Sequence, residues 1–217
     1  LGITTNSLPA IKLTANYESS LHKETTMANQ STTGFGLRPI AKIGQNDNNA
    51  GLSEWNVAAS SAIMYHHDMV MLTADGVILQ ATDSVANNLG SLNGVFYTDA
   101  TTSKPTWANY SKASNTATDI VALVNSDPQQ IFEIRDAGST LAVADVGGTS
   151  KIVATAGSSI NFVSGETIYD AAGTAADQLK ILGVSFDEQN QDPTVAGCIW
   201  RVQIYEHILG NICTQGI

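Results

Sequence analysis

Short apolar runs separated by turn residues dominate the chain from residue 34 onward. The most regular run is 199–206, where Trp200, Val202 and Ile204 alternate with polar residues. Alternation with a period of two places every second side chain on one face of an extended strand. Phe132 alternates with its polar neighbours in the same way within 130–135. The pattern therefore predicts half-buried β-strands.

We predict an all-β chain in which helices play a small part. The Asp75-Gly76 pair lies between two apolar runs and predicts a tight hairpin. Segments 83–89 and 171–178 each favour a helical turn or two, and 98–118 is expected to be a long polar loop. The predicted strands are 63–72, 77–81, 94–97, 119–124, 130–135, 141–144, 151–154, 160–163, 180–186 and 199–206.

The length of 217 residues suits one substantial core, so we expect a single β-barrel or β-sandwich domain over 27–217 with long loops. Residues 1–26 lack a clear period and precede Met27. Lys23-Glu24 can be encoded by a ribosome-binding sequence at a suitable distance before that methionine. We expect 1–26 to lie outside the core fold, either as a translated leader or as an extended N-terminal arm.

Charge and composition narrow the classes of partner. Only 14% of residues are charged, the net charge is -10 and the sequence pI is about 4.6. An acidic chain without a basic cluster repels a phosphate backbone, so we expect no nucleic-acid binding. No apolar run approaches the roughly 20 residues that span a bilayer, so we expect no membrane partner. The two cysteines, Cys198 and Cys213, do not form a disulfide framework or a zinc motif.

Candidate chemistry is sparse, and we predict no enzyme activity, cofactor or metal. His66-His67-Asp68 offers two imidazoles and a carboxylate. Neighbouring residues of a strand point to opposite faces, however, so we interpret the two histidines as structural. Asp187-Glu188 with Asp192 matches no EF-hand loop, and a solvated acidic turn is favoured over a calcium site.

Three aromatic residues lie in segments that we expect to be loops: Trp55, Trp107 and Tyr110. Large aromatic side chains often anchor contacts between subunits. Trp107 and Tyr110 can also stack on a sugar ring, as in a carbohydrate-binding module. We favour subunit packing, because no cluster of further polar and aromatic residues surrounds them.

Several sequence patches follow one another along residues 27 to about 210: GFGLRPI at 34–40, IMYHHDMV at 63–70, GVFYTD at 94–99, KPTW at 104–107, DIVALV at 119–124 and WRVQIYEH at 200–207. In this order they resemble a family of tailed-bacteriophage virion proteins, described as capsid decoration or cement proteins. This chain departs from the family's Gly-Asp-x-Val pattern by carrying His67 before Asp68.

The resemblance implies a structural protein of the virion, made in the bacterial host cytoplasm and bound to the capsid exterior. Its expected partners are the major capsid protein and further copies of itself, as a homo-oligomer such as a trimer. The alternative is a carbohydrate-binding module on the virion for attachment to the host surface. The expected interface residues are Phe35, Leu37, Arg38, Pro39, Trp55, Trp107 and Tyr110.

Overall fold

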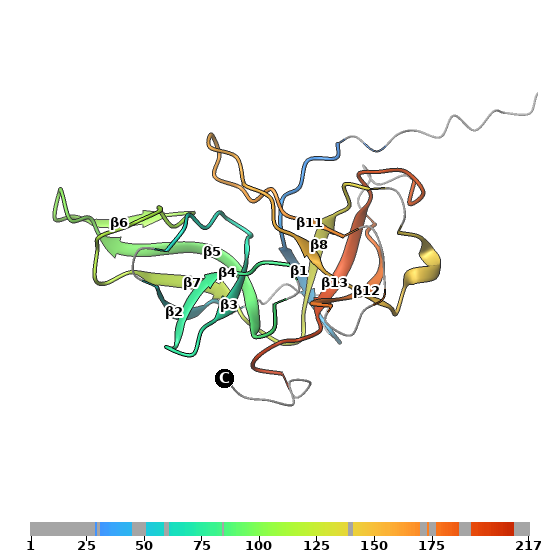
Figure 1. Cartoon of the computed structure of the whole chain (residues 1–217), viewed down its shortest axis with the longest axis horizontal. Helices are drawn as coiled ribbons and strands as arrows, with labels where there is room; N and C mark the ends of the chain where they lie inside the picture. The colour runs from blue at the N-terminus through green and yellow to red at the C-terminus, as the bar shows by residue number, and fades with distance from the viewer. Residues whose placement is uncertain are drawn as a thin grey trace, which may run out of the picture.

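The computed structural model describes most of the chain between residues 29 and 210. The described residues are 29, 31–44, 51–58, 61–83, 85–138, 141–169, 173, 177–186 and 192–210. Within them the protein consists of strands and one short 3-10 helix, Val143–Asp145. The predicted all-β class is confirmed, with sheets that pack together (Figure 1).

Five strands form a closed circuit of pairings, which we call the barrel, at one end of the molecule. Their order is β3-β4-β2-β7-β5, and β5 pairs back to β3. β5 is eleven residues long, so its first part pairs with β3 and its last part with β6. The five strands are β2 (Ser53–Val57), β3 (Met69–Leu72), β4 (Val77–Gln80), β5 (Asn88–Thr98) and β7 (Val121–Asn125). A sixth strand, β6 (Pro105–Ala108), is attached to the barrel at the end of β5.

The other end of the molecule is an antiparallel sheet of order β1-β8-β13-β12-β9, which we call the open sheet. A two-stranded ribbon, β10 and β11, lies beside it (Figure 1). The strands are β1 (Arg38–Lys42), β8 (Gln130–Arg135), β9 (Thr149–Ser150), β10 (Ile152–Val153), β11 (Thr167–Ile168), β12 (Leu179–Val184) and β13 (Ile199–Ile204).

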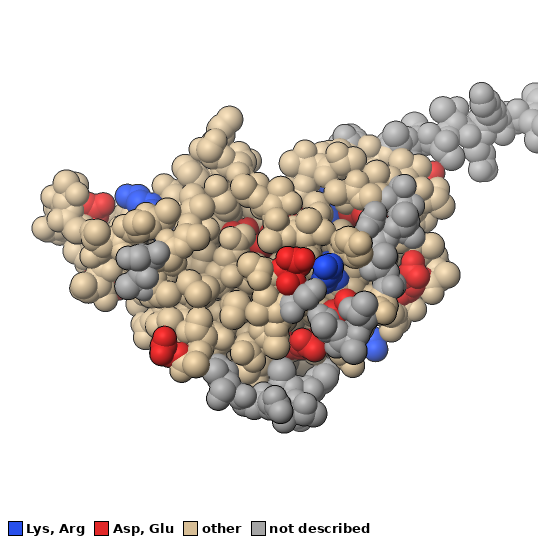
Figure 2. All heavy atoms as spheres, viewed as in Figure 1, with Lys and Arg blue, Asp and Glu red and all other residues tan. Residues whose placement is uncertain are grey.

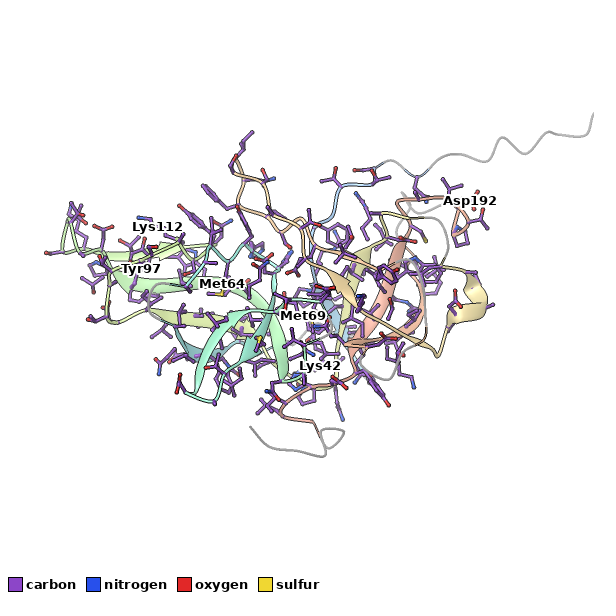
Figure 3. All side chains as sticks on the ribbon, in the orientation of Figure 1. Lys42, Met64, Met69, Tyr97, Lys112 and Asp192 are labelled. Carbon is purple, nitrogen blue, oxygen red and sulfur yellow. The ribbon has the colours of Figure 1, made fainter. Side chains whose placement is uncertain are left out.

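β3 joins the hydrophobic cores of the barrel and the open sheet. Val70 and Leu72 belong to the barrel core, whereas Met69 belongs to the core under the open sheet and Met71 packs against it. This alternation follows from the period of two along a strand. Figure 3 shows Met69 at the junction of the two parts, with Met64 inside the barrel. A change in β3 therefore affects both cores.

Most of the predicted strands are present, with shifted ends. Segment 130–135 matches β8, and 77–81, 119–124, 180–186 and 199–206 correspond to β4, β7, β12 and β13. The Asp75-Gly76 hairpin is confirmed, because β3 and β4 are antiparallel and the Thr73 amide donates to the Val77 carbonyl over 2.9 Å. Alternation succeeded here because each of these strands buries one face.

Two predicted strands are wrong. Segment 141–144 leads into the 3-10 helix, where the Asp145 carboxylate accepts the Ala142 amide over 2.8 Å. Segment 160–163 is the end of a turn, in which the Ser158 hydroxyl accepts the amides of Ile160 and Asn161. Local bonds from side chain to backbone replace a strand partner at both places.

The sequence patterns also missed several strands. β1, β2, β6, β9 and β11 were not predicted. The helical turn predicted at 83–89 is wrong in its described part, because 85–87 are not helical and β5 begins at Asn88. Trp55 and Trp107 therefore lie in strands rather than in loops. Segment 63–72 is a strand only from Met69, and most of 171–178 lies outside the described residues. Residues 1–28 and Cys213 also lie outside them.

Candidate interaction surface

Two aromatic residues, Phe96 on β5 and Trp107 on β6, form an exposed pair on the barrel, which we call the aromatic pair. They are register partners, and 48% of Phe96 and 49% of Trp107 is exposed to solvent. Their neighbours Val95 and Tyr97 point into the core. A Cβ atom on Gly94 would lie only 2.6 Å from the indole of Trp107, so the indole rests directly on this backbone. The aromatic pair is therefore held in a fixed position.

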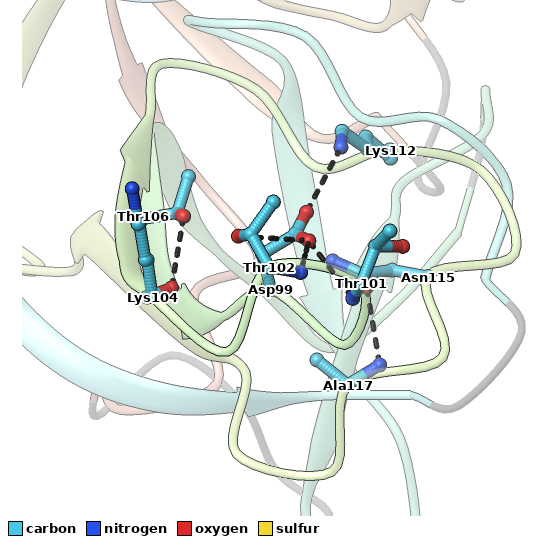
Figure 4. Close-up of polar contacts among 8 residues, drawn as sticks. All are labelled: Asp99, Thr101, Thr102, Lys104, Thr106, Lys112, Asn115 and Ala117. Atoms are coloured by element: carbon cyan, nitrogen blue, oxygen red, sulfur yellow. Dashed lines mark hydrogen bonds and ion pairs between the residues drawn. The ribbon is translucent and has the colours of Figure 1, made fainter.

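The turn that leads into β6 is ordered by one carboxylate (Figure 4). The Asp99 side chain accepts hydrogen bonds from the amides of Thr101 and Thr102, both over 3.0 Å, and lies 3.8 Å from the Lys112 ammonium. The Thr102 amide is the main cause that lowers the pKa of Asp99. The first part of the predicted loop 98–118 is thus a hairpin that ends with β6 at Ala108, whereas 109–118 connects β6 toward β7 without a strand of its own.

A second exposed apolar feature is the connection between β10 and β11. Its residues 154–163 project from the junction of the two sheets (Figure 1), and we call them the protruding loop. Ile160 lies at the turn and is 90% exposed. The Asn161 side chain accepts the Val163 amide, and Phe162 has a φ of +55°. The turn is therefore shaped by local bonds while its apolar residue faces water.

Tyr110 braces the protruding loop against the barrel. Its ring stacks on Phe162, with the ring centroids 3.8 Å apart and the planes at 6°. The side-chain amide of Asn109 donates to the Asn161 carbonyl over 3.2 Å. Asn109 and Tyr110 are the first two residues after β6, so these contacts fix the loop relative to the strand that carries Trp107. Two of the predicted aromatic residues, Trp107 and Tyr110, thus lie in the same part of the molecule, at β6 and the protruding loop.

The histidine segment holds the base of the protruding loop. His66 donates its amide to the Phe162 carbonyl over 2.9 Å and accepts the Ser164 amide at its own carbonyl over 2.8 Å. A nitrogen of its ring lies 2.8 Å from the Asn93 carbonyl oxygen. These bonds tie the loop to the barrel at its C-terminal end.

His67 departs from the expected strand geometry. Its φ is +70°, and its ring centroid lies 3.8 Å from that of His66, so the two rings share a side instead of facing opposite ways. Burial, followed by the nearby positive charges of His66 and Arg38, lowers the pKa of His67 to about 3. The structural interpretation of the histidines stays, but the reason given from strand alternation is wrong.

Two carboxyl groups, Asp68 and Glu166, lie in the interior at the same junction, and we call them the carboxyl pair. Both residues are 0% exposed. Glu166 accepts the Met69 amide over 2.8 Å and the Gln80 side chain over 3.1 Å, while Asp68 accepts the Tyr65 amide over 2.7 Å. Burial raises the pKa of Asp68 to about 6. Burial, and then the charge of Asp68, raise the pKa of Glu166 well above its usual range.

A groove of about 410 Å³ separates the protruding loop from the segment that precedes β1. Phe35 and Arg135 line one side, and Gly157, Ser158 and Asn161 line the other. The corresponding hollow beside the projecting loop is visible in Figure 2. The groove combines an aromatic ring, a guanidinium group and polar backbone.

The predicted contact residues of segment 34–39 are half-buried or buried. The guanidinium carbons of Arg38 and Arg135 lie 4.8 Å and 5.2 Å from the centroid of the half-buried Phe35 ring. Leu37, in contrast, is 0% exposed and belongs to the core, so its side chain is not available to a partner. Arg38 pairs with Glu133 over 2.5 Å.

The remaining predicted residues lie apart from this region. Trp55 is on β2, which is separated from β5 by β7, and it packs against the barrel core. Pro39 is half-buried within β1. Asp187 and Glu188 lie outside the described residues, and Asp192 accepts the amide of Thr194 over 2.8 Å. Cys198 is a buried core residue.

Among the described residues, no group of three or more His, Cys, Asp and Glu side chains is placed to hold a metal ion. The part of the chain that the structure describes contains no helix of the length and apolarity that crossing a membrane requires.

Sequence patterns left three residues of this region unidentified: Phe96, Ile160 and Glu166. Phe96 was detectable, because it alternates with the apolar Val95 and Tyr97 and must point outward if they point inward. Glu166 sits in a polar stretch that gives no sign of burial.

Comparison with known proteins adds no relative: no family model, no curated protein and no solved structure matches this chain.

Proposed function

We propose that this protein is a structural protein of a tailed-phage particle, which binds the outside of the capsid and stabilises contacts between capsid subunits. The resemblance of its ordered sequence patches to capsid decoration proteins suggests this role. The observation that carries the proposal is the exposure of large apolar side chains on an ordered surface: the aromatic pair, and Ile160 on the protruding loop, which the stack of Tyr110 on Phe162 fixes.

An exposed region of this kind has physical consequences for binding. Aromatic residues concentrate binding energy at protein interfaces when a partner removes them from water. Their surroundings are already ordered here, because Trp107 rests on Gly94 and the protruding loop is braced by a ring stack. A rigid surface loses little conformational entropy on binding, which favours affinity. Repetition over a symmetric shell multiplies the effect of each contact.

The test is binding to capsids prepared without this protein, from the phage that encodes it. The double variant Phe96→Ser with Trp107→Ala should lose most of its binding in co-sedimentation, and Ile160→Ser should weaken it. Phe186→Ser is the matched control, because Phe186 is an 87% exposed aromatic residue that follows β12 in the open sheet. Full binding by the double variant would refute the role of this surface.

The same surface fits contact between copies of the chain, and the expected homo-oligomer is part of the proposal. Sedimentation equilibrium of the purified protein measures its assembly state. A trimer that dissociates in the Phe96→Ser, Trp107→Ala variant would assign the aromatic pair to self-contact. A variant that stays trimeric but no longer binds capsids would assign it to the capsid.

Carbohydrate binding is a second candidate, favoured by one observation. The rings of Phe96 and Trp107 lie in register on neighbouring strands, each about half exposed, and such rings can stack on the apolar face of a sugar. A glycan array with the wild-type protein and Trp107→Ala separates the candidates. Reproducible glycan binding that the variant loses would favour attachment to the host surface over capsid cementing.

A further inference from the structure

The carboxyl pair lies where three segments of the chain meet. Asp68 follows the histidine segment and precedes β3, and Glu166 lies between the protruding loop and β11. The third segment, ahead of β1, runs between them: Gly36 donates its amide to the Glu166 carbonyl over 3.1 Å, and Leu37 donates to the His67 carbonyl over 2.8 Å. The pair therefore sits at the connection between the barrel, the loop and the open sheet.

The three segments that meet at the carboxyl pair are in close contact. Gly36 has a φ of +73°, and a Cβ atom there would collide with the His67 carbonyl and the Ser164 side chain. Ser164 bonds both members of the pair: its hydroxyl accepts the Glu166 amide over 3.0 Å, and its side chain hydrogen-bonds Asp68. No room for a hydration shell remains around these groups, because both carboxyl residues are 0% exposed.

No cation neutralises the pair within the described part of the chain. The ion pairs of that part join other residues, and Glu166 takes its contacts from the neutral Met69 amide and Gln80 side chain. The other titratable groups on the segments that meet here are Tyr65, whose amide bonds Asp68, and His66, His67 and Arg38. Arg38 is paired with Glu133. Two buried carboxylates without a counter-ion repel each other and lose hydration, so at least one proton is expected to stay in the pair.

We propose that the carboxyl pair is a pH-sensitive link between the protruding loop and the barrel. While the pair carries a proton, the base of the loop stays against the barrel, and when both carboxyls ionise, the base of the loop is released. The proposal concerns the regulation of the surface described above, but its test involves no capsid. A negative result here would leave capsid binding untouched, and a negative capsid result would leave this link untouched.

Ionisation of the carboxyl pair should lower the stability of the folded protein as pH rises. A carboxyl whose pKa is raised by folding binds its proton more tightly in the folded state, so stability falls as pH rises from the unfolded pKa through the folded one. For Asp68 the window runs from about pH 4 to about pH 6. For Glu166 the loss continues to higher pH. Burial lowers the pKa of His67 and of His207, so their opposing effect fades as pH rises above the unfolded value of about 6.5.

The first measurement is urea unfolding at pH 6.5, 7.5 and 8.5. For the wild type, the unfolding equilibrium constant should rise with pH, by at most about tenfold per pH unit, the limit for one proton lost on unfolding. In Glu166→Gln the rise should disappear, because the amide keeps the shape without ionising. Glu54→Gln, an exposed carboxyl on β2, is the matched control and should behave like the wild type.

The second measurement locates the effect by amide hydrogen exchange at pH 6.5 and 8.5, corrected for the intrinsic rate. The amides of His66 and Ser164, which bond the loop base, should lose at least tenfold more protection than the Val124 amide on β7. Asp68→Asn serves as a second variant if Glu166→Gln does not fold. Equal loss of protection at both places, or a pH profile unchanged in a folded variant, would overturn the proposal.

Discussion

The tip and the base of the protruding loop depart from the usual distribution of side chains in opposite directions. At the tip, Ile160 places an apolar side chain in water, and at the base Glu166 places a carboxyl in the interior. Each arrangement costs free energy in the isolated chain. Such departures usually mark functional positions. The tip gains from a partner that covers it, whereas the base gains from a proton.

Substitutions at the base of the protruding loop should lower the free energy of unfolding most. Gly36→Ala introduces a Cβ atom that collides with the His67 carbonyl, at a φ of +73°, so we expect the free energy of unfolding to fall by about 4 kcal/mol or more. Gly44→Ala is the control, because Gly44 has a φ of +80° and no heavy atom within 4 Å. It should lose only about 1–2 kcal/mol. Equal losses in urea unfolding would contradict the close contact.

One substitution at two places compares the exposed tip with the buried ribbon. Ile152→Ala on β10 removes a side chain that is 0% exposed and should cost about 2–5 kcal/mol. Ile160→Ala, eight positions later on the protruding loop, should change the free energy of unfolding by less than about 0.5 kcal/mol. Thermal or urea unfolding measures both. A large loss at Ile160 would mean that its role is structural.

Acid should weaken the protein through buried histidines. Burial lowers the pKa of His67 to about 3 and that of His207 to about 4. The unfolded state then binds more protons, so stability falls as pH drops below about 6.5, by at most about 1.4 kcal/mol per pH unit for each histidine. Asp68 opposes this fall between about pH 4 and pH 6.

His67→Asn isolates the contribution of that ring, because asparagine tolerates the φ of +70° without titrating between pH 4 and 7. Its unfolding free energy should fall less steeply toward acid than that of the wild type. His66→Asn is the neighbouring comparison. If His67→Asn kept the full acid dependence, the cause would lie elsewhere.

The smallest expected effect is the coupling across the ring stack that joins loop and barrel. Tyr110→Ala and Phe162→Ala, measured singly and together, should give an interaction energy of about 0.5–1.5 kcal/mol. The single variants should also increase hydrogen exchange at the Val163 amide. A coupling near zero would show that the stack does not brace the loop.

Much of the fold followed from alternation, because β8, β12 and β13 each bury one face of an antiparallel sheet. Alternation failed where pairing does not depend on a buried face. β1 is half-buried along its whole length, and β6 begins at Pro105 on the edge of its sheet. The run at 160–163 resembled a strand, but the Ser158 and Asn161 side chains turn its backbone.

The site was predictable only in part. Trp107 and Tyr110 were found because large aromatic residues in polar surroundings are conspicuous, and the structure brings them to one region through β6. The role of Glu166 was not predictable. Its partner amide, that of Met69, is 97 positions away in the sequence, so its burial depends on a contact between distant segments that no local pattern encodes.

The most direct test of the proposed interaction surface is hydrogen exchange of the wild-type protein, free in solution and bound to capsids. Binding should slow exchange in the protruding loop and along β6, at residues 158–163 and 105–110, and leave β12 and β13 unchanged. Protection confined to the open sheet around Phe186, or no protection anywhere on the bound protein, would contradict it.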